Sequence, residues 1–217
     1  MIPINLAVED ELTEHVMRAL LQATSRPYSV EAVYRKGGFV YLKQKILAFN
    51  QAARITPYLI VTDLDKAECP PELIENWFVC QLADYPLRKN ASLLFCVAVR
   101  EVESWILADR AGFALFLGIS ADLIPPYPEQ IVDPKRALIQ LAKRCRHRQT
   151  RQDIVPGASS ILPVGPGYTE RLASFVYRRW SVETACRSSP SLQRAFTLLM
   201  GFRNPQLPKD DLENASM

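Results

Sequence analysis

The stretch Ile60-Val61-Thr62-Asp63-Leu64-Asp65-Lys66 decides the fold, because it is an apolar, β-branched run that ends in two aspartates one residue apart. Such a run is typical of a buried strand in a parallel sheet, and sites in parallel sheets lie outside the carboxyl ends of the strands. Asp63 and Asp65 are expected at that end, where two carboxylates repel each other unless a cation such as Mg²⁺ lies between them. The stretch therefore predicts either a metal site or an aspartate turn that only ends the strand.

Acidic residues also follow two other predicted strands. The apolar run 4–8 ends at Glu9, and an acidic helix start follows it. Asp10 and Glu11 fit the first turn of that helix, where the helix dipole favours acids, whereas Glu9 ends the strand. The run 92–99 is the strongest strand pattern in the chain, and Glu101 and Glu103 come directly after it. Acidic residues at three strand ends favour the metal site over a chance arrangement.

The spacing of Glu101 and Glu103 leaves two geometries open. Residues two apart on a regular helix cannot face the same point. If the strand continued through residue 103, alternation by two would return both side chains to one face.

The rest of the first half predicts a layered α/β sheet. Strands are expected near 4–9, 28–34, 58–63 and 92–99, each followed by a helical pattern. Gly37-Gly38 breaks the chain before the second helix, and Pro70-Pro71 suits the first turn of the third. This alternating order predicts a parallel sheet with helices on both faces and with Glu9, Asp63 and Glu101 at the same edge.

Composition limits the class of protein. A chain of 217 residues suits one α/β domain with an appended part, and its 48% hydrophobic content indicates a packed globular protein. No run of 18 apolar residues and no secretory signal is visible, so we expect a cytoplasmic protein without a membrane partner. The five cysteines are scattered without C-x-x-C spacing, three of them in apolar contexts that predict buried thiols. With only two histidines, the sequence disfavours a zinc site.

Charge is unevenly distributed along the chain. Residues 133–203 carry 13 Lys and Arg against 4 Asp and Glu, although the net charge of the chain is only +3. Asp133-Pro134 predicts a helix start, and residues 135–151 hold seven basic side chains and no acidic one. Cations are favoured at a helix C-terminus in any case; the functional alternative is a nucleic-acid phosphate surface. That surface would comprise Lys135, Lys143, Arg144, Arg146 and Arg148.

The last part of the chain predicts helices without a recognisable motif. The segment 159–168 is rich in turn-forming residues, and it is not a P-loop because no Gly-Lys-Ser/Thr follows. Helices are expected at about 169–186 and 191–200, with Trp180 and Phe196 in the core. The expected organisation is a catalytic core at 1–110, a basic and mainly helical extension at 111–203, and a flexible tail at 204–217.

Three acidic motifs, taken in order, resemble a known family. They are Val8-Glu9-Asp10-Glu11-Leu12-Thr13-Glu14, Val61-Thr62-Asp63-Leu64-Asp65 and Glu101-Val102-Glu103-Ser104-Trp105. Together they resemble the Toprim domain of topoisomerases, primases and OLD-type nucleases, over roughly residues 3–110. The third motif looks like the E-x-W segment of small Toprim proteins often encoded beside an OLD- or SMC-type ATPase in bacterial defence loci. Asp10 replaces the family's glycine, and one extra residue separates Glu9 from Glu14, so the place of Glu14 is left open.

The resemblance implies an Mg²⁺- or Mn²⁺-dependent nuclease acting on DNA or RNA. It implies a Toprim-like sheet, a role in antiphage defence and an OLD- or SMC-type ATPase partner, and it leaves a homodimer open. The implied catalytic residues are Glu9, Asp63, Asp65, Glu101 and Glu103, and the implied metal ligands are Glu9, Asp63, Asp65 and Glu103. Arg100, Lys66 or Lys135 would stabilise the transition state. The alternative is a non-catalytic nucleic-acid-binding or regulatory subunit that keeps the same fold.

Overall fold

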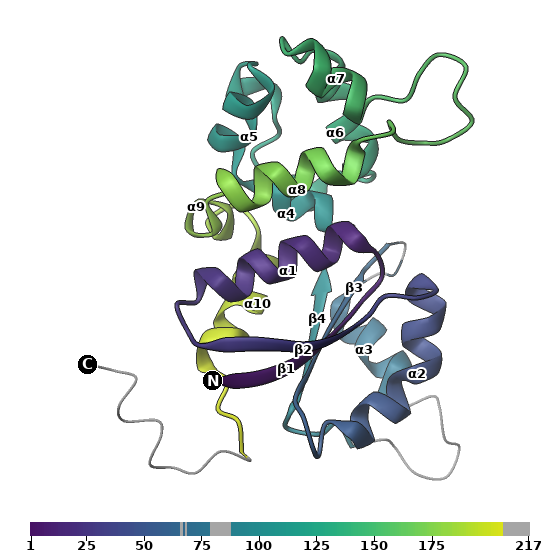
Figure 1. The fold of residues 1–217 in the computed structure, drawn as a ribbon, viewed down its shortest axis with the longest axis vertical. Coiled ribbons are helices and arrows are strands. Elements are labelled where there is room, and N and C mark those ends of the chain that lie inside the picture. The colour runs from purple at the N-terminus through teal and green to yellow at the C-terminus, as the bar shows by residue number, and fades with distance from the viewer. Residues whose placement is uncertain (66, 68, 79–87, 206–217) are drawn as a thin grey trace.

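The computed structural model describes residues 1–65, 67, 69–78 and 88–205 (Figure 1). Within this part of the chain, one four-stranded parallel sheet is formed in the order β2-β1-β3-β4. Its strands are β1 (Ile2–Val8), β2 (Tyr28–Tyr34), β3 (Tyr58–Asp63) and β4 (Leu93–Ala98). The predicted α/β class, the predicted strands and their parallel arrangement are confirmed.

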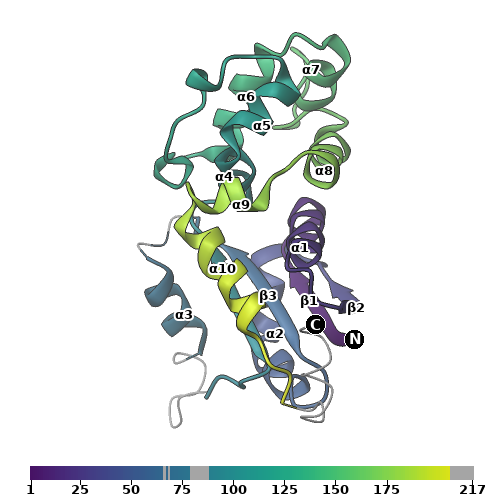
Figure 2. The same cartoon turned by 90° about the vertical axis from the view of Figure 1, so that its left-hand side faces the viewer.

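Helices connect the strands and then build a second layer. The crossover helices are α1 (Glu11–Ala23), α2 (Gly38–Ala52) and α3 (Pro70–Phe78). After β4 come α4 (Val102–Ala108), α5 (Arg110–Leu117), α6 (Pro134–Lys143), α7 (Arg148–Ile154), α8 (Tyr168–Arg178) and α9 (Val182–Cys186), with two short 3-10 turns at Ala121–Leu123 and Pro128–Gln130. These helices form a lobe stacked above the sheet, and α10 (Pro190–Gly201) returns from it to the sheet (Figures 1 and 2).

The two faces of the sheet bury different helices because side chains alternate along each strand. On one face, Leu6, Val61 and Cys96 belong to the core that also contains α1, α4 and α10. On the other face, Ile60 and Phe95 pack with α2 and α3. Burying each large apolar side chain contributes about 1.5–3 kcal/mol. Helices therefore cover both faces, as predicted.

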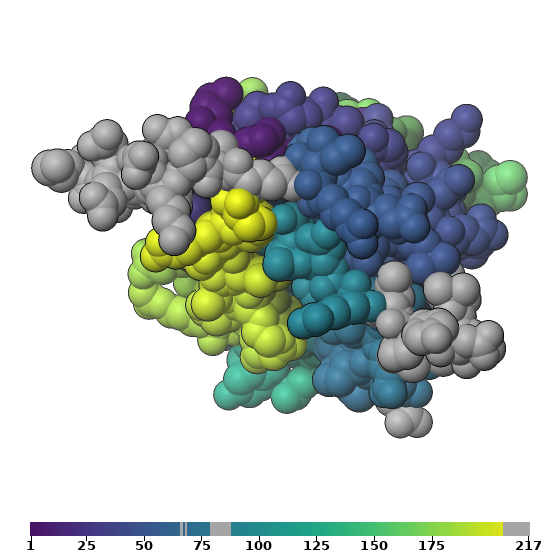
Figure 3. Space-filling model, turned by 90° about the horizontal axis from the view of Figure 1, so that it is seen from below, coloured from purple at the N-terminus to yellow at the C-terminus, as the bar shows by residue number. Residues whose placement is uncertain are grey.

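The last helix joins the basic extension to the sheet. α10 packs against β4, and the view from below in Figure 3 shows it beside this part of the sheet. Ser191, in the first turn of α10, accepts hydrogen bonds from the backbone N–H of Val99 and from the indole N–H of Trp105, at 3.2 and 2.7 Å. One continuous core runs from the sheet into the helical lobe.

One predicted helix in the second half is wrong. The helix expected at about 169–186 is divided between α8 and α9, because Trp180 is buried and Ser181 starts a new helix by accepting from the N–H of Thr184. Asp109 also accepts a hydrogen bond from the Ser181 N–H at 2.9 Å, which fixes the break. The flexible tail expected at 204–217 stays a prediction, because residues 206–217 lie outside the described residues; Asn204 itself is buried.

The predicted start of α6 and the predicted buried thiols are confirmed. Asp133 caps α6, with its side chain accepting from the Arg136 N–H at 2.7 Å, and α6 buries its predicted apolar face. Cys96, Cys145 and Cys186 are buried thiols. No helix of the described residues is long and apolar enough to cross a membrane.

Asp10 serves as the cap of α1, as its position after β1 suggested. One oxygen of Asp10 accepts from the N–H and the hydroxyl of Thr13, both at 2.8 Å. Neighbouring Glu14 pairs with Arg18 at 2.8 Å and with Arg35 at 3.5 Å. Asp10 therefore has a defined structural role at the helix start.

Replacing Asp10 tests this role. We expect Asp10→Ala to lower the free energy of unfolding by about 1 kcal/mol relative to Asp10→Ser, because serine keeps a capping oxygen. Both variants remove the same charge, so their difference, measured by urea denaturation, isolates the cap. Equal stabilities would contradict the capping role.

Candidate metal and catalytic site

The parallel register brings the three acidic strand ends to one edge of the sheet. Val8 pairs with Val61, and Asp63 pairs with Ala98, so β1, β3 and β4 end side by side. Glu9 follows β1, Asp63 ends β3, and Glu101 follows β4 within three residues of its end. The topology therefore produces the expected arrangement of these three residues.

The Glu9 carboxylate accepts hydrogen bonds from the end of the neighbouring strand, β3. Its Oε1 accepts from the Thr62 hydroxyl at 2.5 Å and from the backbone N–H of Asp63 at 2.9 Å. Burial raises the pKa of the Glu9 carboxyl, the two hydrogen bonds oppose this, and the nearby charges of Asp65 and Asp10 add to it. Glu9 is thus held in place by one oxygen at an edge where negative charge accumulates.

Asp63 connects the end of β3 to the start of α4. Its Oδ1 accepts from the backbone N–H of Val102 at 3.0 Å. Burial raises the pKa of Asp63 well above its usual value, and the carboxylates of Glu103 and Glu9 raise it further. A group whose charged form is opposed by its neighbours in this way favours a cation in the same space.

The loop that carries Asp65 is clamped to the loop after β4. Asp65 and Arg100 have positive φ angles of 49° and 67°, a left-handed conformation that is uncommon outside glycine. The Asp65 N–H donates to the Arg100 carbonyl at 3.0 Å, and the Arg100 guanidinium donates to the Asp65 carbonyl at 3.1 Å. Such backbone conformations persist where surrounding contacts enforce them, often at functional sites. The Asp65 carboxylate is exposed at this edge.

Glu101 links the sheet edge to the helical lobe. Its backbone is extended and precedes α4, and its Oε2 accepts from the backbone N–H of Lys135 at 2.9 Å. Lys135 lies in the first turn of α6, where a carboxylate is favoured by the helix dipole. Glu101 therefore orients the start of α6 toward the strand ends.

Glu103 is the most deeply buried of these carboxylates, with 1% of its side chain exposed. Its Oε1 accepts from the Tyr168 hydroxyl at 2.9 Å and lies 3.4 Å from the Lys135 ammonium. Its Oε2 is buried and has no hydrogen-bond partner among the residues that the structure describes. A buried carboxylate oxygen without a partner carries a large desolvation cost, which an added cation would offset.

The structure resolves the geometry of Glu101 and Glu103. The strand ends at Ala98, so it does not continue through residue 103. The backbone of Glu101 is nevertheless extended, whereas that of Glu103 is helical. The Glu101 carboxylate contacts the backbone N–H of Lys135, and the Glu103 carboxylate contacts the Lys135 ammonium. The restriction that holds for two residues on one regular helix does not apply here.

Lys135 is the cation that contacts this carboxylate cluster. Burial tends to lower the pKa of its ammonium, but the carboxylates of Glu103 and Glu101 outweigh burial and raise it above its usual value. Of the other two candidate cations, Arg100 contacts a backbone carbonyl, and Lys66 lies outside the described residues.

Two residues at the site were not predicted from the sequence. Tyr168 donates to Glu103 from 65 positions further along the chain, and nothing in its local sequence indicates that contact. Thr62 lies within the opening motif, but no role at the site was predicted for it. Its hydroxyl nevertheless reaches Glu9 at the sheet edge.

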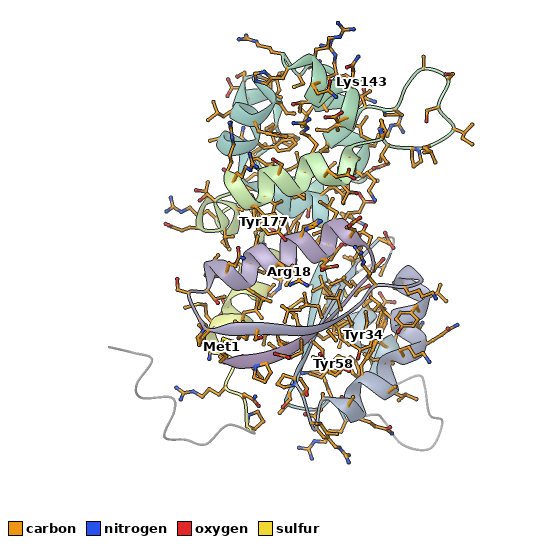
Figure 4. The ribbon with its side chains drawn as sticks, in the orientation of Figure 1. Met1, Arg18, Tyr34, Tyr58, Lys143 and Tyr177 are labelled. Atoms are coloured by element: carbon orange, nitrogen blue, oxygen red, sulfur yellow. The ribbon has the colours of Figure 1, made fainter. Side chains whose placement is uncertain are left out.

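The predicted nucleic-acid-binding residues divide into two groups. Lys135 lies at the carboxylates, whereas Lys143 ends α6 about 12 Å further along the helix axis. Figure 4 shows Lys143 in the part of the helical lobe away from the sheet. Arg144, Arg146 and Arg148 follow it, and all three are exposed, as is Lys143. The predicted exposure is confirmed, but these four cations lie at the end of α6 opposite to the carboxylates.

The residues at the edge fit a hard divalent cation by their chemistry. Glu9, Asp63 and Glu103 each have one oxygen held by hydrogen bonds, and Asp65 is exposed beside them. Within the described residues, no three His, Cys, Asp or Glu side chains already form a group that could hold a metal ion. Cation binding would therefore require these side chains to turn toward a common point.

Comparisons of this chain with protein-family models, with curated proteins and with solved structures find no match.

The buried Glu103 predicts a pH dependence of stability. Burial raises the pKa of its carboxyl from 4.5 to about 7, although Lys135 opposes the shift. The folded state then holds this proton more tightly than the unfolded state, so the contribution of Glu103 to stability is fully present below about pH 4.5 and is lost as the pH rises through about 7. Without divalent metal, we expect the free energy of unfolding to fall by on the order of 2–3 kcal/mol between about pH 5 and pH 8 because of Glu103.

Glu103→Gln should remove most of that fall, measured by urea denaturation in EDTA, since glutamine stays uncharged. The pKa values of Asp63 and Glu9 are raised in the same direction, so a residual slope from these two groups remains in both proteins. Glu183→Gln, at an exposed ion pair with Arg187, is the matched control and should keep the wild-type profile. A Glu103→Gln profile that follows the wild type would show that Glu103 is charged throughout.

Proposed function

We propose that this protein is a divalent-metal-dependent nuclease with a Toprim-like core, cleaving phosphodiester bonds in DNA or RNA. One observation carries the proposal: Glu103 is buried among the strand-end carboxylates with its Oε2 unpartnered. Structural carboxylates are normally satisfied by hydrogen bonds or ion pairs, so an unsatisfied one calls for an explanation. A bound cation supplies it.

The proposed metal ligands are Glu9, Asp63, Asp65 and Glu103. A divalent cation held there would lower the pKa of a bound water and neutralise negative charge at the scissile phosphate. Oxygen-only ligands of this kind favour Mg²⁺ or Mn²⁺ over zinc.

The other residues of the site position these ligands and the substrate. Thr62 and Tyr168 donate to Glu9 and Glu103 and hold one oxygen of each carboxylate. Lys135 presents its ammonium beside Glu103, where it is placed to neutralise charge on a phosphate next to the cluster. Through its contact with the Lys135 backbone, Glu101 holds that lysine in place.

The resemblance of the three acidic motifs extends the proposal to a biological setting. On that basis the protein is a cytoplasmic effector of bacterial antiphage defence, acting with an OLD- or SMC-type ATPase and in some forms as a homodimer. The exposed cations Lys143, Arg144, Arg146 and Arg148 then contact the nucleic-acid backbone away from the cleavage point.

A second candidate is a non-catalytic nucleic-acid-binding or regulatory subunit. It is favoured by the structural contacts that the carboxylates already make, namely Asp63 with the Val102 N–H and Glu101 with the Lys135 N–H. In that case the acids stabilise the start of two helices, and the protein binds nucleic acid without cleaving it.

Asp63→Asn separates the two candidates. The amide oxygen of asparagine still accepts from Val102, so the fold keeps this hydrogen bond while the site loses one charge. We expect cleavage of plasmid DNA or transfer RNA with Mn²⁺ to fall on the order of 100-fold or more. Stability without metal should stay level or rise, because repulsion with Glu9 and Glu103 is relieved.

The control is Asp122→Asn, which makes the same chemical change at an exposed position in the helical lobe. It should cleave like the wild type, and EDTA should abolish cleavage by both. Full cleavage by Asp63→Asn would refute the proposed site. If the wild-type protein binds nucleic acid without added metal and does not cleave it when Mn²⁺ is present, the second candidate is established.

A further inference from the structure

A cavity of about 580 Å³ lies between α7 and the loop that leads to α8. This loop cavity is lined chiefly by Arg151, Gln152, Val155, Leu162, Val164 and Pro166. Its walls are mainly aliphatic, with polar and cationic groups from α7, and the loop projects from the lobe in Figure 1. Leu162 is 62% exposed, so the apolar wall faces solvent.

The loop is fastened to α7 at its returning end. The N–H of Gly165 donates to the Ile154 carbonyl, and the N–H of Gly167 donates to the Asp153 carbonyl, both at 3.0 Å. A side chain at Gly165 would collide with the backbone of Asp153, so this close approach requires glycine. The wall of the cavity is therefore preformed by backbone contacts.

The electrostatic surroundings of the cavity favour an anionic ligand. Arg151 is exposed at the cavity and is positioned by donating to the Cys145 carbonyl at 3.0 Å. Arg148 lies one turn earlier on α7, and Arg144 and Arg146 precede that helix. Asp153, on the same helix, is neutralised by its ion pair with Arg171.

A residue of the cavity wall is near in sequence to a residue that contacts the carboxylate cluster. Pro166 lies two residues before Tyr168, so their Cα atoms are at most about 7 Å apart. Tyr168 in turn donates to Glu103. One chain segment thus connects the cavity wall to the most buried carboxylate of the site.

We propose that the loop cavity holds an unpaired nucleobase, so that the substrate is single-stranded nucleic acid or a duplex with an unpaired nucleotide. This inference rests on the proposed function and specifies the form of its substrate. Aliphatic walls pack against the face of a base, Gln152 and Ser160 offer hydrogen bonds to its edge, and Arg151 meets the adjoining phosphate. A paired base inside a duplex cannot enter such a cavity.

A nucleotide fits these observations better than a protein segment does. The flanking run of residues 135–151 has seven basic side chains and no acidic one, which complements a polyanion. An apolar cavity beside such a run combines backbone charge with aliphatic contact to the face of a base, a contact that pockets for flipped bases also use.

Binding in EDTA tests the inference without requiring cleavage. The probes are fluorescein-labelled oligothymidine of about 16 nucleotides, its duplex with oligoadenine, and an abasic chain of the same length, measured by fluorescence anisotropy. Matching RNA probes distinguish the sugar. We expect the wild type to bind oligothymidine about tenfold more tightly than the abasic chain.

Leu162→Asp places a carboxylate in the apolar wall at an exposed position, so the fold should survive. It should weaken oligothymidine binding about tenfold and remove the preference over the abasic chain, while duplex binding changes less than about twofold. Leu115→Asp, a similarly exposed leucine on α5, is the control and should bind all probes like the wild type.

If Leu162→Asp weakens the binding of all probes equally, the inference is overturned. If Leu162→Asp weakens the binding of none of them, the inference is also overturned, and this result is the one expected when a protein segment occupies the cavity. In either case the proposed nuclease function would stand. A wild-type protein that binds none of the nucleic-acid probes would instead contradict the proposed function itself.

Discussion

The structure depends on how negative charge is accommodated at the carboxyl ends of β1, β3 and β4. Parallel strands place Glu9, Asp63 and the segment carrying Glu101 and Glu103 at one edge, where burial and mutual repulsion oppose ionisation. Lys135, carried in by α6, offsets part of this charge through the 3.4 Å contact with Glu103. The same contact joins α6 to α4 within the helical lobe. Among the described residues Oε2 of Glu103 has no hydrogen-bond partner, so the compensation is incomplete, and this deficit supports the cation site that we propose.

Strand-end geometry was predictable from the sequence because it follows from local patterns. Apolar β-branched runs define buried strands, alternation with helices requires parallel pairing, and parallel pairing aligns strand ends. The acidic residue after each run is therefore located without knowledge of tertiary contacts. The same applies to the start of α6, where Asp133 and the following proline form a local capping signal. Asp10 was likewise predicted as part of a helix start, and it caps α1.

Contacts between distant segments were not predictable in this way. Tyr168 reaches Glu103 because α8 packs across the lobe. The basic residues after Lys143 lie at the end of α6 away from the carboxylates, because packing sets the direction of this helix. The break between α8 and α9 depends on the buried Trp180 and on the hydrogen bond that the Asp109 carboxylate accepts from the Ser181 N–H, in addition to the cap that Ser181 provides for α9. Sequence periodicity describes which face of a helix is buried, but not which partner covers it.

Direct measurement of Mn²⁺ binding tests the central claim that these carboxylates form a cation site. The paramagnetic resonance signal of free Mn²⁺ should decrease when wild-type protein is added at about pH 8, which lies above the raised pKa of about 7 of the Glu103 carboxyl. We expect saturable binding that Mg²⁺ displaces and that Asp63→Asn weakens, because the ligands are hard oxygen donors. A free Mn²⁺ signal that remains equal to that of buffer at every protein concentration would contradict the account. The carboxylates would then be explained by their hydrogen bonds to Val102, Lys135 and Tyr168 alone.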